Sequence, residues 1–92
     1  MSTQHTPAPW ATDGDAYSGN LDIISPTGRV AMLDCEFSEE TEDVLTANAH
    51  LIAAAPDLLA CLLDVLDADG DLNAMNFDRY RAVIAKATGG AA

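Results

Sequence analysis

The alternation of apolar and polar positions predicts a β-hairpin in the first half of the chain. Two stretches, 20–25 and 29–35, are rich in apolar and β-branched residues and flank Pro26, Thr27 and Gly28. Proline presets the first central position of a turn and glycine tolerates positive φ, so we expect the stretches to pair as an antiparallel hairpin over about 20–35. The alternation is only partial, which predicts that one face of the hairpin lies on helices.

The pattern then changes to the three- and four-residue spacing of amphipathic helices. A hydroxyl residue followed by acidic residues at 38–42 marks a helix start. Pro56 predicts a kink or a junction between two helices, because proline costs no hydrogen bond in the first turn of a helix. The helix before it carries an inward stripe made of Val44, Leu45, Ala47, Leu51, Ile52 and Ala55.

A second helix is expected over 57–66, and it is apolar around most of its circumference. We therefore expect this segment to be the centre of the core or of an oligomer interface. A third, weaker helix follows Asn76, a plausible N-cap. Its apolar face combines Phe77, Tyr80, Val83 and Ile84.

These elements predict a single α+β domain over 1–92, a small antiparallel β-sheet packed against two or three α-helices. Residues 1–18 contain prolines and glycines without a regular period and are expected to form an extended arm, anchored to the core by Trp10. The β-hairpin occupies 19–36, the helical part 39–88, and 89–92 form a frayed tail.

The charge of the chain is strongly one-sided. The chain has fifteen Asp and Glu residues and four Lys and Arg residues, which gives a net charge of −11. Of all residues, 49% are hydrophobic. The chain is too apolar to be read as disordered. Direct binding to nucleic acid or to anionic lipid is disfavoured because both require a basic protein surface. A basic protein surface is the expected partner.

Targeting and redox features point to an intracellular protein. No basic stretch followed by an apolar run is present near the start of the sequence, so we expect no signal peptide. The most apolar region, 51–66, is interrupted by Pro56, Asp57 and Asp64 and is too short to span a membrane. Cys35 and Cys61 are expected to be reduced thiols.

One segment is similar to the start of a calcium-binding loop. Asp67, Asp69 and Asp71 have the spacing of loop positions 1, 3 and 5. The loop's sixth position should be glycine but is Leu72, and its twelfth should be glutamate but is Asp78. A solvated acidic turn between two helices is therefore the preferred interpretation.

Catalytic and metal-binding chemistry finds no support in the sequence. His5, His50 and the two cysteines lack the close paired spacing of structural zinc sites. No Ser or Cys lies in a turn that would expose it beside a base and an orienting acid, and no glycine-rich phosphate loop is present. We expect no enzyme activity, no catalytic residue, no metal and no cofactor.

The most unusual local feature is a run of acidic residues between the hairpin and the first helix. A solvated connection with some benefit from the helix dipole is one interpretation. A charged face that occupies a Lys/Arg groove of another protein is the other, and the candidate partner-binding residues are Asp34, Glu36, Glu39, Glu40, Glu42, Asp43, Asp67, Asp69 and Asp71. An apolar or aromatic centre could come from Tyr17, Met32, Met75 and Phe77. The third helix carries Arg79, Arg81 and Lys86, which could contact RNA.

Two motifs give a resemblance to small bacteriophage and prophage proteins. One is the TPAPW sequence at 6–10, and the other is ANAHLIAAAPDLL at 47–59; a Gly-Arg-Val-Ala strand at 28–31 accompanies them. The resemblance covers about 6–66, and 67–92 match no pattern of this group. The matching positions are scaffold residues, so the resemblance implies no catalytic residue.

Some small acidic phage proteins of this size are anti-CRISPR proteins, and the chain is similar to inhibitors of type I-F surveillance complexes. The resemblance implies a stoichiometric inhibitor in the cytoplasm of the infected bacterial host, whose carboxylates pair with Lys and Arg that a CRISPR complex uses to bind target DNA. Whether the acidic residues or the three basic residues of the third helix make the contact is left open by the sequence, and the basic residues could contact guide RNA. The alternative is a phage structural or regulatory adaptor that homodimerises through its leucine-rich helices.

Overall fold

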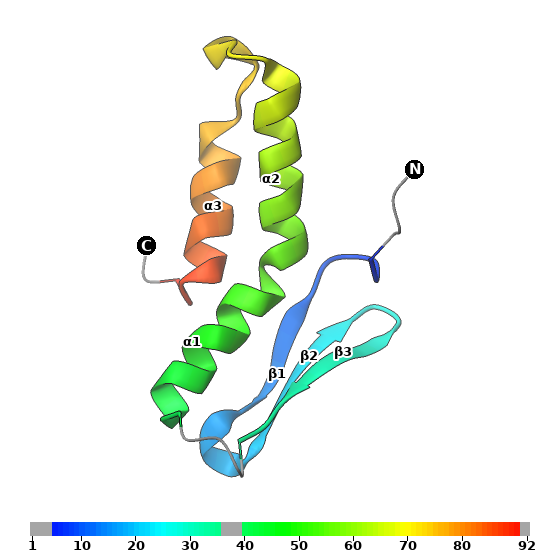
Figure 1. The fold of residues 1–92 in the computed structure, drawn as a ribbon, viewed down its shortest axis with the longest axis vertical. Helices are drawn as coiled ribbons and strands as arrows, with labels where there is room; N and C mark the ends of the chain where they lie inside the picture. The colour runs from blue at the N-terminus through cyan, green and yellow to red at the C-terminus, as the bar shows by residue number, and fades with distance from the viewer. Residues whose placement is uncertain (1–4, 36–39, 91–92) are drawn as a thin grey trace.

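A computed structural model describes residues 5–35 and 40–90 of the chain. Its elements confirm the α+β fold: a three-stranded antiparallel sheet in the order β1-β2-β3 and three α-helices (Figure 1). Two short 3₁₀ turns, η1 and η2, join elements. The bounds are β1 Ala11–Asp15, η1 Ala16–Ser18, β2 Asn20–Ser25, β3 Gly28–Leu33, α1 Glu42–Ala53, α2 Ala55–Ala68, η2 Leu72–Ala74 and α3 Phe77–Ala87.

The predicted hairpin is formed by β2 and β3. Ser25 organises its turn: the Ser25 hydroxyl accepts from the Thr27 backbone N–H at 3.2 Å and donates to the Gly28 carbonyl at 3.0 Å. Gly28 has a φ of 135°, which explains the glycine at this position. The strand pairing ends at Leu33, two residues before the predicted limit.

The segment 1–18 was expected to be an extended arm, but it contains strand β1 and the whole of η1. Strand β1 pairs along its whole length with β2. Its sequence is Ala-Thr-Asp-Gly-Asp, and four of the five residues are exposed, so it carries no apolar alternation. Pairing with β2 therefore makes it a strand, and local propensity does not. Trp10 packs against the core as predicted, and its indole N–H donates to the Thr6 carbonyl at 3.1 Å.

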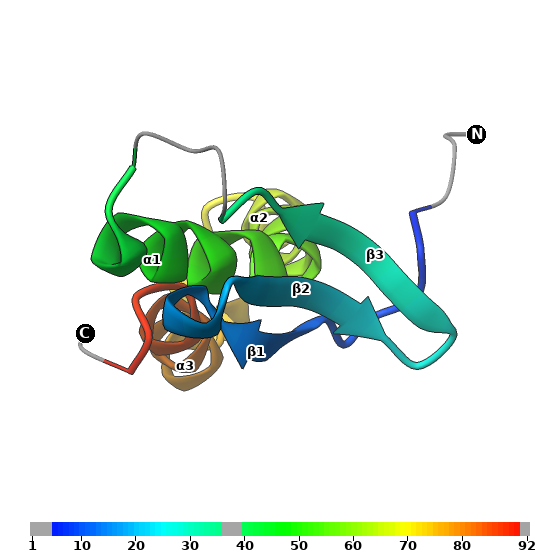
Figure 2. The same ribbon diagram turned by 90° about the horizontal axis from the view of Figure 1, so that it is seen from below.

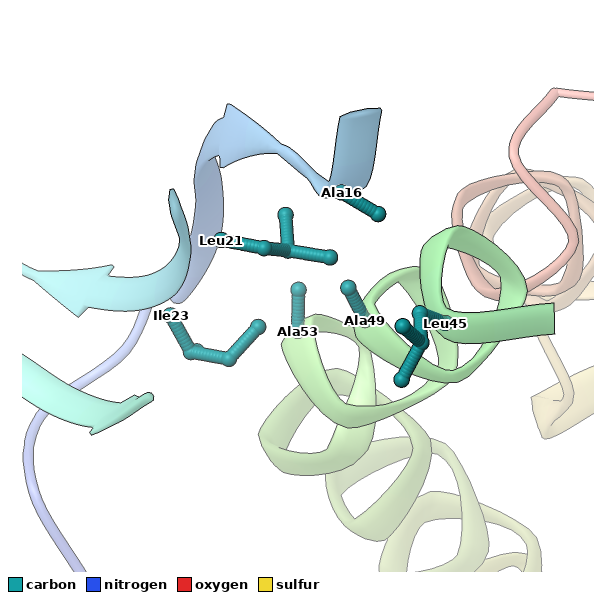
Figure 3. Close-up of a cluster of buried hydrophobic side chains, with 6 residues drawn as sticks. All are labelled: Ala16, Leu21, Ile23, Leu45, Ala49 and Ala53. Atoms are coloured by element: carbon teal, nitrogen blue, oxygen red, sulfur yellow. The ribbon is translucent and has the colours of Figure 1, made fainter. Parts of the chain in front are cut away.

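The core lies between α1 and one face of the sheet (Figures 1 and 2). Leu21 and Ile23 are fully buried on β2 because residues two apart share a sheet face. On α1 the matching face presents two alanines and a leucine at four-residue steps, which lets the helix approach the sheet closely. Figure 3 shows these side chains pointing toward one another: Ala16, Leu21, Ile23, Leu45, Ala49 and Ala53.

The helical part bends at Pro56 as the sequence predicts, but its first helix begins at Glu42, three residues after the expected start at 39. The Thr41 side chain caps α1 by accepting from the Val44 backbone N–H at 3.3 Å. Pro56 lies in the first turn of α2, and the axes of α1 and α2 differ by 47° at this junction. Asn76 caps α3 by accepting from the Arg79 backbone N–H at 3.0 Å.

The bend directs α2 away from the sheet, and α3 runs back beside it (Figure 1). Two side-chain contacts join these helices. Lys86 pairs with Asp57 at 2.7 Å, and the Tyr80 hydroxyl donates to Asp64. Only Pro56 and Cys61 of α2 are buried. The expectation that this helix is the centre of the core is therefore wrong, and the leucines that suggested it lie on the surface.

Candidate functional site

The predicted acidic residues fall into two groups at opposite ends of the molecule. One group lies at the start of α1, and the other lies at the end of α2 and in the turn that follows (Figure 1). The chain is 46 Å long on its longest axis, along which the two groups are separated. They cannot form one continuous face. Glu36 and Glu39, which were also predicted to bind a partner, lie outside the described residues.

The group at the start of α1, here called the α1 end, consists of Glu40, Glu42 and Asp43, all exposed. Glu42 and Asp43 occupy the first turn of the helix, where the positive end of its dipole stabilises negative charge. Asp34 is exposed just beyond β3, and the end of that strand lies at the same end of the molecule (Figure 1). The α1 end therefore gathers most of the described residues of the predicted acidic run.

An exposed tyrosine belongs to the α1 end. Tyr17 comes from η1, is 69% exposed, and its hydroxyl donates a hydrogen bond to the Asp43 carboxylate. This bond raises the pKa of the tyrosine above its usual value of 10.0, and the negative charge of Asp43 adds to the effect. The bond fixes an aromatic ring beside a carboxylate that is 26 positions away in the sequence. Sequence analysis named both residues without predicting their contact.

The second group, Asp67, Asp69 and Asp71, does not converge as a calcium loop would require. Asp69 is the left-handed C-cap of α2, with a φ of 50°. The Asp71 carboxylate accepts from the Asn73 backbone N–H at 3.0 Å and caps η2. Within 5–35 and 40–90, no three His, Cys, Asp or Glu side chains are placed to hold a metal ion.

The basic residues of α3 do not form one patch. Lys86 and Arg79 are seven residues apart and share a helix face, but Arg81 is two residues from Arg79 and lies on another. Lys86 is paired with Asp57, and Arg81 lies 3.4 Å from Asp78. Arg79 lines a surface hollow together with Asp64 and Asp67 of α2. Contact of these residues with RNA stays a prediction.

The predicted aromatic and methionine centre is dispersed in the same way. Tyr17 lies in η1, Met32 in β3, and Met75 and Phe77 at the start of α3. Only Tyr17 is joined to an acidic residue of the α1 end by a hydrogen bond. The large exposed apolar side chains are instead concentrated on α2. The sequence predicted that this helix is the centre of either the core or an oligomer interface.

The family comparison now gives the origin of the chain. The model of the family described as Salmonella phage P22 protein Y8K6 matches residues 1–91. The chain belongs to this family.

The Y8K6 family match confirms the expected small phage protein. No curated protein and no solved structure matches the chain. Among the described helices none is long and apolar enough to cross a membrane alone; α1 and α2 satisfy length and composition as a pair but are bent by 47°.

Proposed function

We propose that this phage protein is an anti-CRISPR protein that binds a type I CRISPR surveillance complex stoichiometrically and blocks its binding of target DNA. The observation that carries the proposal is the α1 end, where exposed carboxylates of the first turn of α1 lie beside an exposed tyrosine that is hydrogen-bonded to one of them. A complex that captures DNA presents Lys and Arg to phosphates, and a surface of carboxylates offers those cations another partner.

The composition of the α1 end fits the anatomy of a binding hot spot. Exposed ion pairs are worth only about 0.2–1 kcal/mol each, so carboxylates alone give orientation and rapid association more than affinity. Tyrosine is enriched among residues that dominate binding energy. The Tyr17–Asp43 hydrogen bond holds the ring in one place before binding, which reduces the entropy lost on association.

The ion pairs that the structure assigns within 5–35 and 40–90 involve carboxylates other than Glu42 and Asp43. Three of the four basic side chains lie within 4.0 Å of one of the chain's own carboxylates: Arg29 with Asp22, Arg81 with Asp78, and Lys86 with Asp57. None of these pairs lies in the α1 end. A basic partner would therefore meet Glu42 and Asp43 outside these three ion pairs.

The experiment compares charge reversal at the two ends. Glu40→Lys combined with Glu42→Lys changes the α1 end and leaves the Tyr17–Asp43 pair in place. Asp67→Lys combined with Asp69→Lys makes the same change in net charge at the far end of α2 and serves as the control. The purified proteins are added to a type I surveillance complex, and complex recovery and target DNA binding are measured across a salt series.

The proposal predicts that the unmodified chain is recovered with the complex and abolishes its binding of target DNA. Both the recovery and the inhibition should decrease as the salt concentration rises. The α1-end variant should lose both effects, and the control should keep them. Absence of the complex in the recovered fraction would refute the CRISPR assignment. Equal loss in both variants would mean that overall charge, and not the α1 end, makes the contact.

An adaptor of phage structure or regulation is the second candidate. The exposed leucines of α2 favour it, because a small chain seldom leaves a row of large apolar side chains in water without a partner. In this function the negative charge serves solubility. Recovery of phage proteins alone from infected cells would favour the adaptor over the inhibitor.

A further inference from the structure

The exposed apolar surface of α2 has the geometry of a helix-pairing seam. Leu59, Leu62, Leu63 and Leu66 follow one another at three- and four-residue steps, and these leucines are 45%, 68%, 57% and 76% exposed, respectively. On a helix this spacing places all four side chains along one face. We call this set the α2 seam. It contains no charged residue, in a chain whose net charge is −11.

The α3 helix does not cover the seam. It packs on the neighbouring face of α2, where Cys61 is buried and Asp57 and Asp64 contact Lys86 and Tyr80. An apolar groove with a volume of about 380 Å³ runs between the two helices, lined by Leu58, Cys61, Leu62, Val65, Tyr80 and Ile84. The seam and the groove share Leu62, so together they form one continuous apolar surface.

The accessible surface of the whole chain is larger than a monomer of this mass needs. It measures 6302 Å², whereas a compact monomer of 9.6 kDa exposes about 5,100 Å². The radius of gyration is 15.0 Å, against about 12 Å for a compact chain of 92 residues. Part of this surplus lies on α2, where the seam leucines and the adjoining groove are exposed; a standard interface buries roughly 800 Å² from each partner.

We propose that a second copy of this chain covers the α2 seam, with the two α2 helices packed antiparallel. The seam has the leucines of a two-turn knobs-into-holes contact, and a helix face of this kind is complementary to itself. An antiparallel arrangement that places Leu59 beside the partner's Leu66 also places Leu62 beside the partner's Leu63.

Charge decides the direction of packing. The carboxylates of Asp67, Asp69 and Asp71 all follow the seam at the C-terminal end of α2. A parallel pair would bring the two sets together, and like charges in contact repel. The antiparallel pair places each set at the opposite end of the interface, beside the first turn of the partner's α2. The centre of the contact is then purely apolar.

This dimer has a salt dependence opposite to that of the proposed inhibitor. Two chains of the same sign repel over a distance of about 10 Å at 0.1 M salt and only about 3 Å at 1 M. Dimerisation should therefore strengthen as salt rises, whereas binding of a basic partner should weaken. The dimer uses the same α2 leucines as the adaptor hypothesis. It can form whether or not the chain binds a CRISPR complex, so its test needs only the purified protein.

Sedimentation equilibrium of the full chain at several protein concentrations and two salt concentrations measures the association. Leu62→Glu introduces a charge at the centre of the seam and should weaken the dimer by about 10- to 100-fold or more, because a leucine is lost from the contact. Leu51→Glu is the matched control, since Leu51 is an exposed leucine on α1, outside the seam. It should leave the dimer unchanged. Circular dichroism verifies that both variants are folded.

The direction of packing is tested with two single-cysteine additions. Chains carrying Leu59→Cys are mixed with chains carrying Leu66→Cys, oxidised, and the linked peptides are identified by mass spectrometry. Bridges between position 59 of one chain and position 66 of the other support the antiparallel pair. Bridges only between identical positions would overturn it in favour of a parallel pair. A monomer at every concentration and salt, or equal effects of Leu62→Glu and Leu51→Glu, would overturn the seam itself.

Discussion

Replacement of Gly14 by alanine is the sharpest test of strand β1, the element that the sequence did not predict. Gly14 has a φ of 86°, a conformation that side chains rarely adopt. A Cβ added there would lie 1.9 Å from the Asn20 carbonyl oxygen. That oxygen belongs to the backbone of the paired strand, so the contact cannot be relieved by rotating a side chain.

Gly19 supplies a matched control for the magnitude. It has a similar φ of 79°, but an added Cβ would meet no atom within 4 Å. Gly19→Ala should therefore cost only the left-handed strain, about 1–2 kcal/mol. Gly14→Ala adds the displacement of β1 from β2, and with about 1 kcal/mol for each backbone hydrogen bond lost, its total cost should be about 3 kcal/mol or more.

Urea and thermal denaturation followed by circular dichroism measure both free energies of unfolding. For a domain of this size, about 1 kcal/mol corresponds to roughly 4–8 °C in Tm. Gly14→Ala should thus lower the Tm by about 12 °C or more, and Gly19→Ala by about one to two thirds as much. Equal losses in the two variants would refute the reasoning, because they would show that β1 does not approach Asn20 as the structure has it.

Three further perturbations test charge and hydrogen bonding. Asp13→Thr should raise the free energy of unfolding by up to about 1 kcal/mol in urea denaturation, because Asp13 lies directly opposite Asp22 across the β1–β2 pair; no gain would contradict this. Lys86→Met should lower the free energy of unfolding by up to about 1 kcal/mol, because the half-buried ion pair of Lys86 with Asp57 joins α3 to α2. Arg81→Met is the control and should change this free energy little, because the ion pair of Arg81 is exposed. Tyr17 and Tyr80 both donate to carboxylates, so an alkaline titration of tyrosinate absorbance should show both ionising above the usual pKa of 10.0. The stabilisation from these hydrogen bonds is complete below pH 10.0 and should be lost as the pH rises through the raised pKa values. Ionisation at the usual pH would contradict both hydrogen bonds.

Local signals were sufficient for most element boundaries. The turn residues between β2 and β3, the bend at Pro56 and the cap at Asn76 all act within a few residues of sequence, and the structure has each where the pattern predicts it. Strand β1 has no such signal. Its polar residues become a strand only because β2 offers them hydrogen-bonding partners, and those partners are known only once the sheet exists.

The same division applies to the candidate sites. The sequence shows a net charge of −11 and a helix too rich in leucine to stand alone, and both follow from composition and period. It could not separate the acidic residues at the start of α1 from those that follow α2, because that separation depends on the path of the chain between them. It also could not join Tyr17 to Asp43, a contact between η1 and α1.

From the sequence alone follow the α+β class, the hairpin, two or three helices and the sign of the surface charge, because these depend on neighbours along the chain. The tertiary structure alone decided which apolar residues become core. The alanines of α1 allow that helix to lie closely on Leu21 and Ile23, while the bend at Pro56 carries α2 away from the sheet. Two helices with similar apolar patterns therefore differ in burial: α1 contributes side chains to the core, and α2 exposes its leucines to solvent.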